Sequence, residues 1–165
     1  GACTASGCTP RADTRAFRTA ARLHHSMGRD LDEAPPLDVF LHPGGQGTRR
    51  QLADEEHLQW MRSLRGSVPL MTSVCTGSLV FAAAGLLTHR PATTHWASLE
   101  KLSQLDPTIQ VRAGERFVDD GDTVTSAGIS AGIDMALHLV ARLTSAERAE
   151  QVRRGIQYDW QAPAG

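Results

Sequence analysis

The fold of this chain is decided by the stretch Val68-Pro69-Leu70-Met71-Thr72-Ser73-Val74-Cys75-Thr76-Gly77-Ser78-Leu79-Val80-Phe81-Ala82. An apolar run leads into small polar residues and a second apolar run follows, which is typical of a strand, a sharp turn and a helix. Such a turn strains the residue at its apex and crowds the positions two residues to either side. Cys75 stands at the apex, and Ser73 and Gly77 beside it are both small. The pattern therefore predicts a nucleophile elbow with a thiol at its tip.

A thiol in this position lies at the N-terminus of a helix. Unpaired backbone N–H groups and the helix dipole there favour the thiolate over the thiol. Most free cysteines are instead small buried hydrophobes, and that alternative stays open for Cys75. The elbow favours the reactive interpretation, because a cysteine that only fills the core does not need a strained turn.

Composition limits the classes of protein and partner. The chain has 165 residues, 41% of them hydrophobic, and a formal net charge of −1, which fits one globular domain. Its 17 Lys and Arg residues are scattered, so we expect small uncharged substrates, with neither nucleic acid nor a membrane surface as a partner. The sequence has no apolar run long enough for a bilayer and its start lacks the apolar core of a signal peptide, which predicts a cytoplasmic protein.

Cysteine and histidine spacing gives no sign of a disulfide framework or a metal centre. The three cysteines are Cys3, Cys8 and Cys75, an odd number, and the first two are too far apart for a CxxC motif. Neighbouring side chains such as those of His24 and His25 diverge, and no cluster of metal-type ligands lies near them in sequence. We expect no metal and no cofactor.

Strand and helix patterns alternate along most of the chain. They predict strands over 37–41, 68–72 and 90–96, helices over 54–65, 76–87 and 98–105, a hairpin around Asp120-Gly121-Asp122, an apolar helix after the loop 126–130, and a last helix from Ser145. Leu58, Met61 and Leu64, and likewise Met135, Leu139 and Leu143, have the spacing of core residues. The predicted fold class is α/β, a parallel sheet with helices on both faces.

Residues 1–36 do not follow this pattern. They hold many small and charged residues and suggest one element, a helix over 14–25. We therefore divide the chain into a divergent N-terminal segment, 1–36, in which no clear strand is seen, and one α/β domain, 37–165.

Four blocks of sequence resemble the ThiJ/PfpI superfamily of the class I glutamine amidotransferase-like, flavodoxin-like fold. The blocks are Asp38–Gly45, Thr72–Leu79, Ala92–Trp96 and Thr125–Ala136. Within the superfamily, the chain looks most like the isonitrile hydratase group and the amidase-like domains of AraC-type regulators. In the protease-like branch a histidine follows the cysteine, whereas this chain has Thr76, so peptidase activity is disfavoured.

The resemblance implies a cysteine-dependent hydratase that converts small isonitriles to N-substituted formamides, and a homodimer. In related hydratases a first strand and the loop after it supply an acidic residue that faces the cysteine, and the resemblance implies that this strand is missing or divergent here. No acidic residue of this chain lies in a matching motif, so that role is assigned to none. The alternatives are a ligand-sensing domain without turnover and a degenerate family member.

In this interpretation the backbone N–H groups of Gly45 and Thr76 would bind developing negative charge beside Cys75. Gly44 would let the backbone approach closely, although a plain tight turn after a strand explains a glycine pair equally well. Strands of a parallel sheet place ligands beyond their carboxyl ends, so one pocket is expected to hold Gly44, Gly45, Cys75 and Gly128.

His95 lies in the Ala92–Trp96 block and has two interpretations. It could form a Cys–His dyad with Cys75, or it could be structural, with Trp96 packed and the imidazole bonded to the backbone. Gly128 and Ile129, near the start of a helix, are expected to shape the substrate site.

Overall fold

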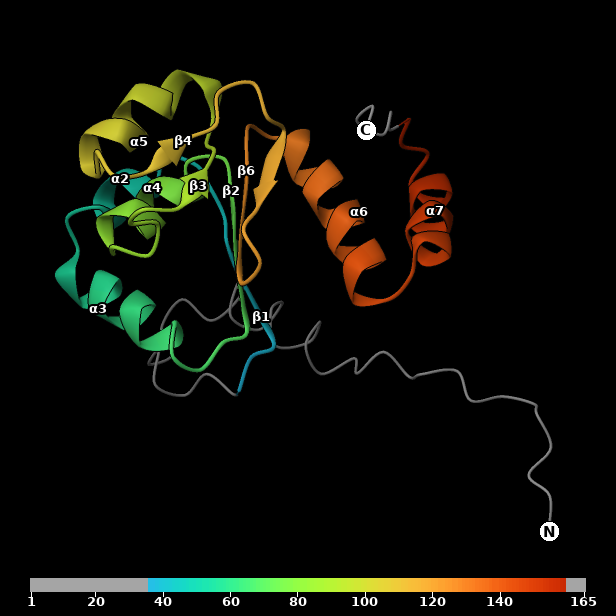
Figure 1. The fold of residues 1–165 in the computed structure, drawn as a ribbon, viewed down its shortest axis with the longest axis horizontal. Coiled ribbons are helices and arrows are strands. Elements are labelled where there is room, and N and C mark those ends of the chain that lie inside the picture. Colours follow the sequence, from blue (N-terminus) through green and yellow to red (C-terminus); the bar gives the residue numbers. More distant parts are fainter. Residues whose placement is uncertain (1–35, 160–165) are drawn as a thin grey trace, which may run out of the picture.

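The computed structural model describes residues 36–159, and its centre is a four-stranded sheet in the order β1-β2-β6-β5 (Figure 1). Strands β1 (Val39–His42), β2 (Leu70–Val74) and β6 (Thr123–Ser126) are parallel, and β5 (Phe117–Asp119) runs antiparallel to β6. The predicted α/β sheet is confirmed, with one antiparallel strand at its edge.

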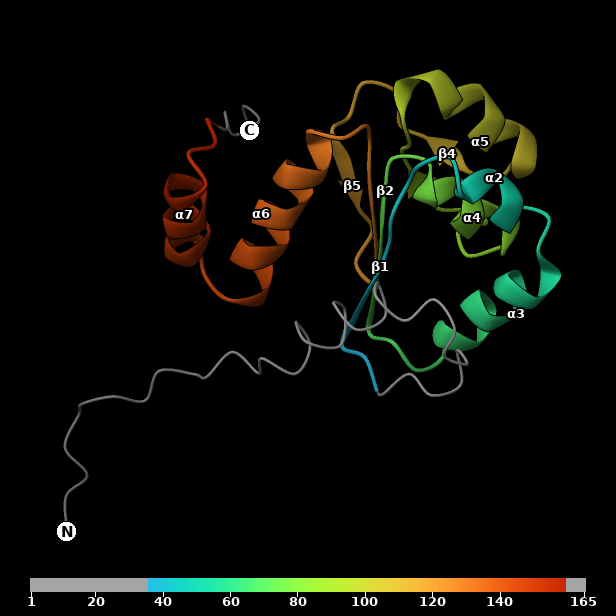
Figure 2. The same ribbon diagram turned by 180° about the vertical axis from the view of Figure 1, so that it is seen from behind.

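Helices cover both faces of this sheet. Helices α3 (Glu55–Leu64), α4 (Gly77–Ala83) and α5 (Leu99–Leu105) lie on one side, and α6 (Ala131–Leu143) lies on the other (Figures 1 and 2). Helix α7 (Ala146–Gly155) packs on the outer side of α6. None of the helices within the described residues is long and apolar enough to cross a membrane.

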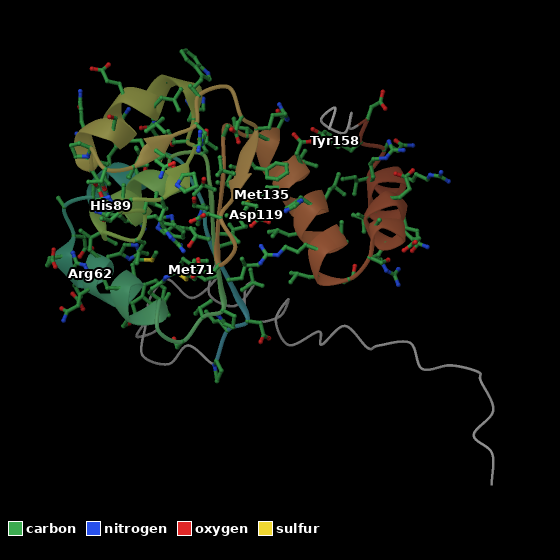
Figure 3. All side chains as sticks on the ribbon, in the orientation of Figure 1. Arg62, Met71, His89, Asp119, Met135 and Tyr158 are labelled. Atoms are coloured by element: carbon green, nitrogen blue, oxygen red, sulfur yellow. The ribbon has the colours of Figure 1, made fainter. Side chains whose placement is uncertain are left out.

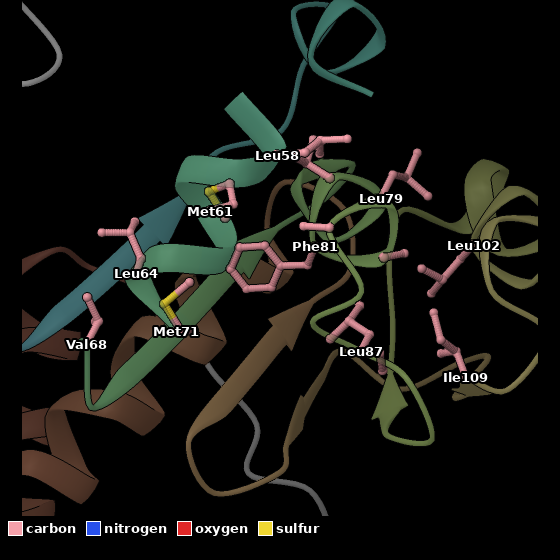
Figure 4. Packing of buried hydrophobic residues seen from close by; sticks show 14 residues of the cluster. Leu58, Met61, Leu64, Val68, Met71, Leu79, Phe81, Leu87, Leu102 and Ile109 are labelled. Carbon is pink, nitrogen blue, oxygen red and sulfur yellow. The ribbon is translucent and has the colours of Figure 1, made fainter. Parts of the chain in front are cut away.

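The two cores follow from the alternation of side chains along β2. Met71 belongs to the larger core, with Met61 of α3 and Phe81 of α4, which Figure 4 shows from close by. Its neighbour Leu70 belongs to the smaller core on the α6 side. Figure 3 accordingly shows Met71 and Met135 on opposite sides of the sheet. Because successive residues of a strand point to opposite faces, one strand supplies both cores.

Helix α3 forms as its spacing predicts. Leu58, Met61 and Leu64 are all buried in the larger core. Asp54 caps the helix, and its carboxylate accepts a hydrogen bond from the backbone N–H of His57 at 3.1 Å. The cap satisfies one of the N–H groups that a helix N-terminus leaves without a partner.

The predicted hairpin is also confirmed. Strands β5 and β6 join through Gly121, whose φ of 79° suits glycine. On the α6 side, Arg142 donates to both carboxylate oxygens of Asp119, at 2.9 and 3.0 Å. On the opposite side, Arg65 forms an ion pair with Asp122. The hairpin is therefore tied to both helical layers.

Several predicted boundaries differ from the structure. Helix α4 ends at Ala83 rather than at residue 87, because Gly85 takes a φ of 75° that breaks the helix. The predicted strand 90–96 is reduced to β3 (Pro91–Ala92), which pairs with a strand the sequence did not suggest, β4 (Gln110–Val111), in a separate two-stranded sheet.

Two short helices were not predicted. Helix α2 (Thr48–Gln51) follows the glycine loop, which we define as residues 43–47. A 3-10 turn, η2 (Trp96–Ser98), precedes α5. Elements this short carry too little hydrophobic periodicity to be recognised from sequence.

The proposed N-terminal features lie outside the described residues. These are the helix over 14–25, Cys3, Cys8 and the histidine pair His24 and His25. The division of the chain at residue 36 stays a prediction.

The predicted core stripe of α6 is wrong at its last member. Met135 and Leu139 are buried, whereas Leu143, the last residue of α6, is 57% exposed and does not belong to the smaller core. The same substitution at positions 139 and 143 therefore tests the position of the core.

We expect Leu139→Ala to lower the free energy of unfolding by about 2–5 kcal/mol, since it leaves a cavity in the smaller core. Leu143→Ala should change it by less than about 0.5 kcal/mol, because the side chain is already in water. Urea unfolding followed by circular dichroism measures both. Equal losses in the two variants would contradict this assignment of the core.

Candidate active site

Cys75 occupies the sharp turn between β2 and α4, as the sequence predicts. Its φ of 56° lies in the left-handed region, where a residue other than glycine is strained. The residue is partly exposed and its thiol is free. The structure therefore places Cys75 at a strained turn, as a residue that is neither fully buried nor fully exposed.

Hydrogen bonds hold the backbone of Cys75 in this conformation. Its N–H is shared between the carbonyl oxygens of Ser126 (3.0 Å) and Ala127 (3.2 Å), at the end of β6. Its carbonyl oxygen accepts from the hydroxyls of Ser78 (3.1 Å) and Thr94 (2.9 Å). Strain at one residue persists when its surroundings fix it in this way.

The small residues beside Cys75 are required by their neighbours. A Cβ atom at Gly77 would lie 2.4 Å from the carbonyl oxygen of His42, closer than such atoms can come. Ser73 is completely buried, and its hydroxyl has no hydrogen-bond partner within residues 36–159. The predicted requirement for small side chains is confirmed.

The glycine loop lies directly against the elbow. A Cβ atom at Gly44 would be 2.8 Å from Cys75 Cβ and 2.9 Å from the backbone nitrogen of Thr76. Gly45 has a φ of 121°, a conformation that other residues rarely adopt. The first glycine thus permits a close approach of two backbones, which a plain turn would not need.

Thr76 connects the two segments. Its hydroxyl accepts a hydrogen bond from the N–H of Gly45 at 3.0 Å and one from the Thr48 hydroxyl at 3.2 Å. The backbone N–H of Thr76 has no hydrogen-bond acceptor in the part of the chain that the structure describes. Of the two backbone N–H groups predicted to bind charge, that of Thr76 is therefore free to donate to a ligand, whereas that of Gly45 already donates to a hydroxyl.

His95 is held by its own segment. Its Nδ1 accepts a hydrogen bond from the backbone N–H of Ala97 at 3.3 Å, and its ring lies 2.7 Å from where a Cβ of Gly128 would be. Within residues 36–159 no group forms a hydrogen bond with Cys75 Sγ, so the structure supports the structural interpretation of the imidazole. The expected packing of Trp96 is wrong, since this side chain is 77% exposed.

A cavity of about 430 Å³ opens beside the elbow. It is lined by residues 93–96, Leu99, 114–116 and 127–131, which include His95, Gly128 and Ile129. Not among its lining residues are Gly44, Gly45, Cys75 and Thr76. The prediction that one pocket holds Gly44, Gly45, Cys75 and Gly128 is met by this cavity only for Gly128. Two of its lining residues, Thr94 and Ala127, form hydrogen bonds with the backbone of Cys75, so the cavity adjoins the elbow.

Comparison with known families decides the classification of this fold and elbow. Residues 17–142 match the model of the DJ-1/PfpI family. The chain belongs to this family. The resemblance to the ThiJ/PfpI superfamily inferred from the four sequence blocks is thereby confirmed.

Individual relatives of this DJ-1/PfpI protein include enzymes and regulators. The isonitrile hydratase of Pseudomonas putida is 44% identical over 134 residues, 81% of this chain and 56% of the enzyme. The HTH-type transcriptional regulator CdhR of Pseudomonas aeruginosa is 39% identical over 95 residues, 58% of this chain and 28% of the regulator.

A solved structure of a ThiJ/PfpI family protein from Pseudomonas syringae matches with a TM-score of 0.71 at 34% identity, covering 81% of this chain and 55% of that chain. The chain thus spans between 28% and 56% of the length of these three relatives.

Sequence reasoning missed a histidine pair behind the glycine loop of this DJ-1/PfpI protein. His42 ends β1 and is only 3% exposed, and its Nε2 lies 3.3 Å from Nε2 of His57 on α3. Burial lowers the pKa of His42 to about 4, and it also lowers the pKa of His57. The two histidines are 15 positions apart, so no local motif marks them.

Acidification should destabilise the protein through His42. In the unfolded chain the imidazole has a pKa of 6.5 and in the fold about 4, so the unfolded state binds the proton first. The neutral ring therefore contributes about 3 kcal/mol that is present above pH 6.5 and lost as the pH falls toward 4.

Chemical unfolding of the wild type and His42→Leu between pH 7 and pH 4.5 measures this contribution. The wild type should lose more stability over that range than the variant. Parallel pH dependences in the two proteins would show that His42 does not carry the effect.

Proposed function

We propose that this chain acts as a cysteine-dependent isonitrile hydratase, which converts R–N≡C and water into R–NH–CHO. The observation that carries the proposal is the position of Cys75, a partly exposed residue with a free thiol at a strained elbow, with a glycine loop packed against it. The 44% identity with the isonitrile hydratase of Pseudomonas putida supports it.

In the first step, the thiolate of Cys75 attacks the terminal carbon of the isonitrile. A new C–S bond forms and the same carbon takes a proton from an acid, which gives the thioimidate R–N=CH–S–Cys75. The acid is not assigned to a residue. Covalent attachment divides the addition of water into two easier steps.

In the second step, water adds to the thioimidate carbon and its proton passes to nitrogen. The C–S bond then breaks, which releases the formamide and returns the thiol. Negative charge that develops during these steps would be bound by the open N–H of Thr76 and, once the Thr76 hydroxyl moves away, by the N–H of Gly45.

The substituent R would extend into the cavity beside the elbow. Ile129 and Trp96, both strongly exposed, lie at this cavity, and Gly128 leaves room for the ring of His95. In this proposal Gly128 and Ile129 shape the substrate site, Gly44 permits the close approach to Cys75, and His95 holds the wall of the cavity. The apolar side chains favour an uncharged R group.

Cys75→Ala should abolish formamide production, because no other group in the proposed mechanism attacks the isonitrile carbon. A Cys3→Ser, Cys8→Ser double variant keeps Cys75 and should retain the wild-type rate. Incubation with an aryl isonitrile, with the formamide measured by liquid chromatography, tests both. Equal formamide production by the wild type and Cys75→Ala would refute the proposal.

Thr76→Val should lower kcat by about tenfold to a hundredfold, since it removes the hydroxyl that ties the N–H of Gly45 to the elbow until developing charge displaces it. Thr76→Ser keeps the hydroxyl and should remain within a few-fold of the wild type. Steady-state kinetics on the same isonitrile separates the two variants. If Thr76→Ser loses as much kcat as Thr76→Val, the hydroxyl is not what matters.

The second candidate function is a ligand-sensing domain without turnover. The hydrogen bond from Gly45 N–H to the Thr76 hydroxyl favours it, because one charge-binding donor is already satisfied, and the regulator CdhR is a relative. A wild-type protein that binds an isonitrile but forms no formamide would identify this function. A homodimer, a cytoplasmic location and the absence of a nucleic-acid partner remain predictions.

A further inference from the structure

His42 contacts both sides of the proposed site. Its Nδ1 donates to the carbonyl oxygen of Pro43 at 2.8 Å, which ties the ring to the start of the glycine loop. Its own carbonyl oxygen lies against Gly77, directly after the elbow. The position of this one residue therefore affects where the loop meets Cys75.

The contact between the two imidazoles has a defined proton arrangement. Because His42 Nδ1–H is used by Pro43, Nε2 of the neutral ring is an acceptor, and His57 Nε2–H must donate across the 3.3 Å separation. His57 is thus the group that satisfies the buried nitrogen of His42. Without it, an unpaired acceptor would remain in a buried position, which is unfavourable.

Aromatic rings fix the orientation of this pair. The ring centroids of Phe81 and His42 are 6.2 Å apart in an edge-to-face arrangement, and those of Trp60 and His57 are 5.7 Å apart. The charge of Asp54, which caps α3, opposes the effect of burial by raising the pKa of His57. A charge on His57 would in turn lower the pKa of His42 further. Among the described residues, no group of three or more His, Cys, Asp or Glu side chains that could hold a metal includes this pair.

We propose that His57 is a positioning residue, which acts through His42 to hold the glycine loop against Cys75. The inference rests on the proposed function only in taking Cys75 as the reactive thiol. When the donor at position 57 is absent, His42 turns to another partner, Pro43 follows it, and Gly44 moves away from the Cβ atom of Cys75. Cys75 then becomes more accessible to small reagents, while the N–H of Gly45 is no longer placed for catalysis.

The test compares His57→Phe, which keeps a ring but lacks the donor, with His57→Gln, whose amide restores a donor near the position of Nε2. The rate of Cys75 alkylation by iodoacetamide at pH 7.5 is followed on its own peptide by mass spectrometry. We expect His57→Phe to react about fivefold faster than the wild type, as expected for a locally opened loop, and His57→Gln to stay within about twofold.

His138→Phe is the matched control, because His138 lies on α6, across the sheet, where its Nε2 is 2.6 Å from Asp119. It should leave the alkylation rate within about twofold of the wild type. Should His57→Phe fail to fold, as shown by circular dichroism, His57→Leu takes its place. With an isonitrile as substrate, His57→Phe should lower kcat more than it changes KM.

The inference is overturned if a folded variant without the donor reacts no more than twofold faster than the wild type. It is also overturned if His57→Gln reacts as fast as His57→Phe, since the donor would then be irrelevant. Alkylation does not need turnover, so a wild type without hydratase activity would refute the proposed function and leave this test intact.

Discussion

The structure depends on the hydrogen bonds that hold the backbone of Cys75 in a left-handed conformation. Its N–H continues the pairing between β2 and β6 beyond their last residues, since it bonds to carbonyl oxygens of Ser126 and Ala127. Thr94, which comes from the segment after β3, binds its carbonyl oxygen. The elbow, the end of β6 and the segment after β3 therefore meet at Cys75. Their hydrogen bonds maintain a backbone conformation that costs of order 1–3 kcal/mol.

Much of this arrangement could be read from sequence, because its causes are local. The strained apex at Cys75, the small residues beside it and the core spacing of α3 all follow from patterns within a few residues, and the structure confirms them. The hairpin at Gly121 has the same origin. Prediction is weaker where an element is short or where a helix ends, as the exposed side chain of Leu143 at the end of α6 shows.

The site itself was only partly predictable, because its contacts join residues far apart in the chain. The sequence pattern indicates the glycine loop, but it does not indicate that the N–H of Gly45 donates a hydrogen bond to the Thr76 hydroxyl. The pairing of His42 with His57 depends on how α3 lies over β1, which periodicity does not determine. That the cavity is lined by Thr94 and Gly128 but not by Gly44 or Gly45 likewise depends on where the chain after β3 crosses the end of the sheet.

The Thr76 hydroxyl that accepts a hydrogen bond from the N–H of Gly45 affects which ligands can bind at the glycine loop. Any acceptor that approaches the N–H must first displace an oxygen that already satisfies it, so a neutral ligand gains little by the exchange. An anionic oxygen or nitrogen gains more, because a charged acceptor forms the stronger bond. The Thr76 hydroxyl would therefore compete well against a neutral substrate and poorly against a species that carries negative charge. Binding that is stronger for the charged species than for the substrate is the kind that lowers a reaction barrier.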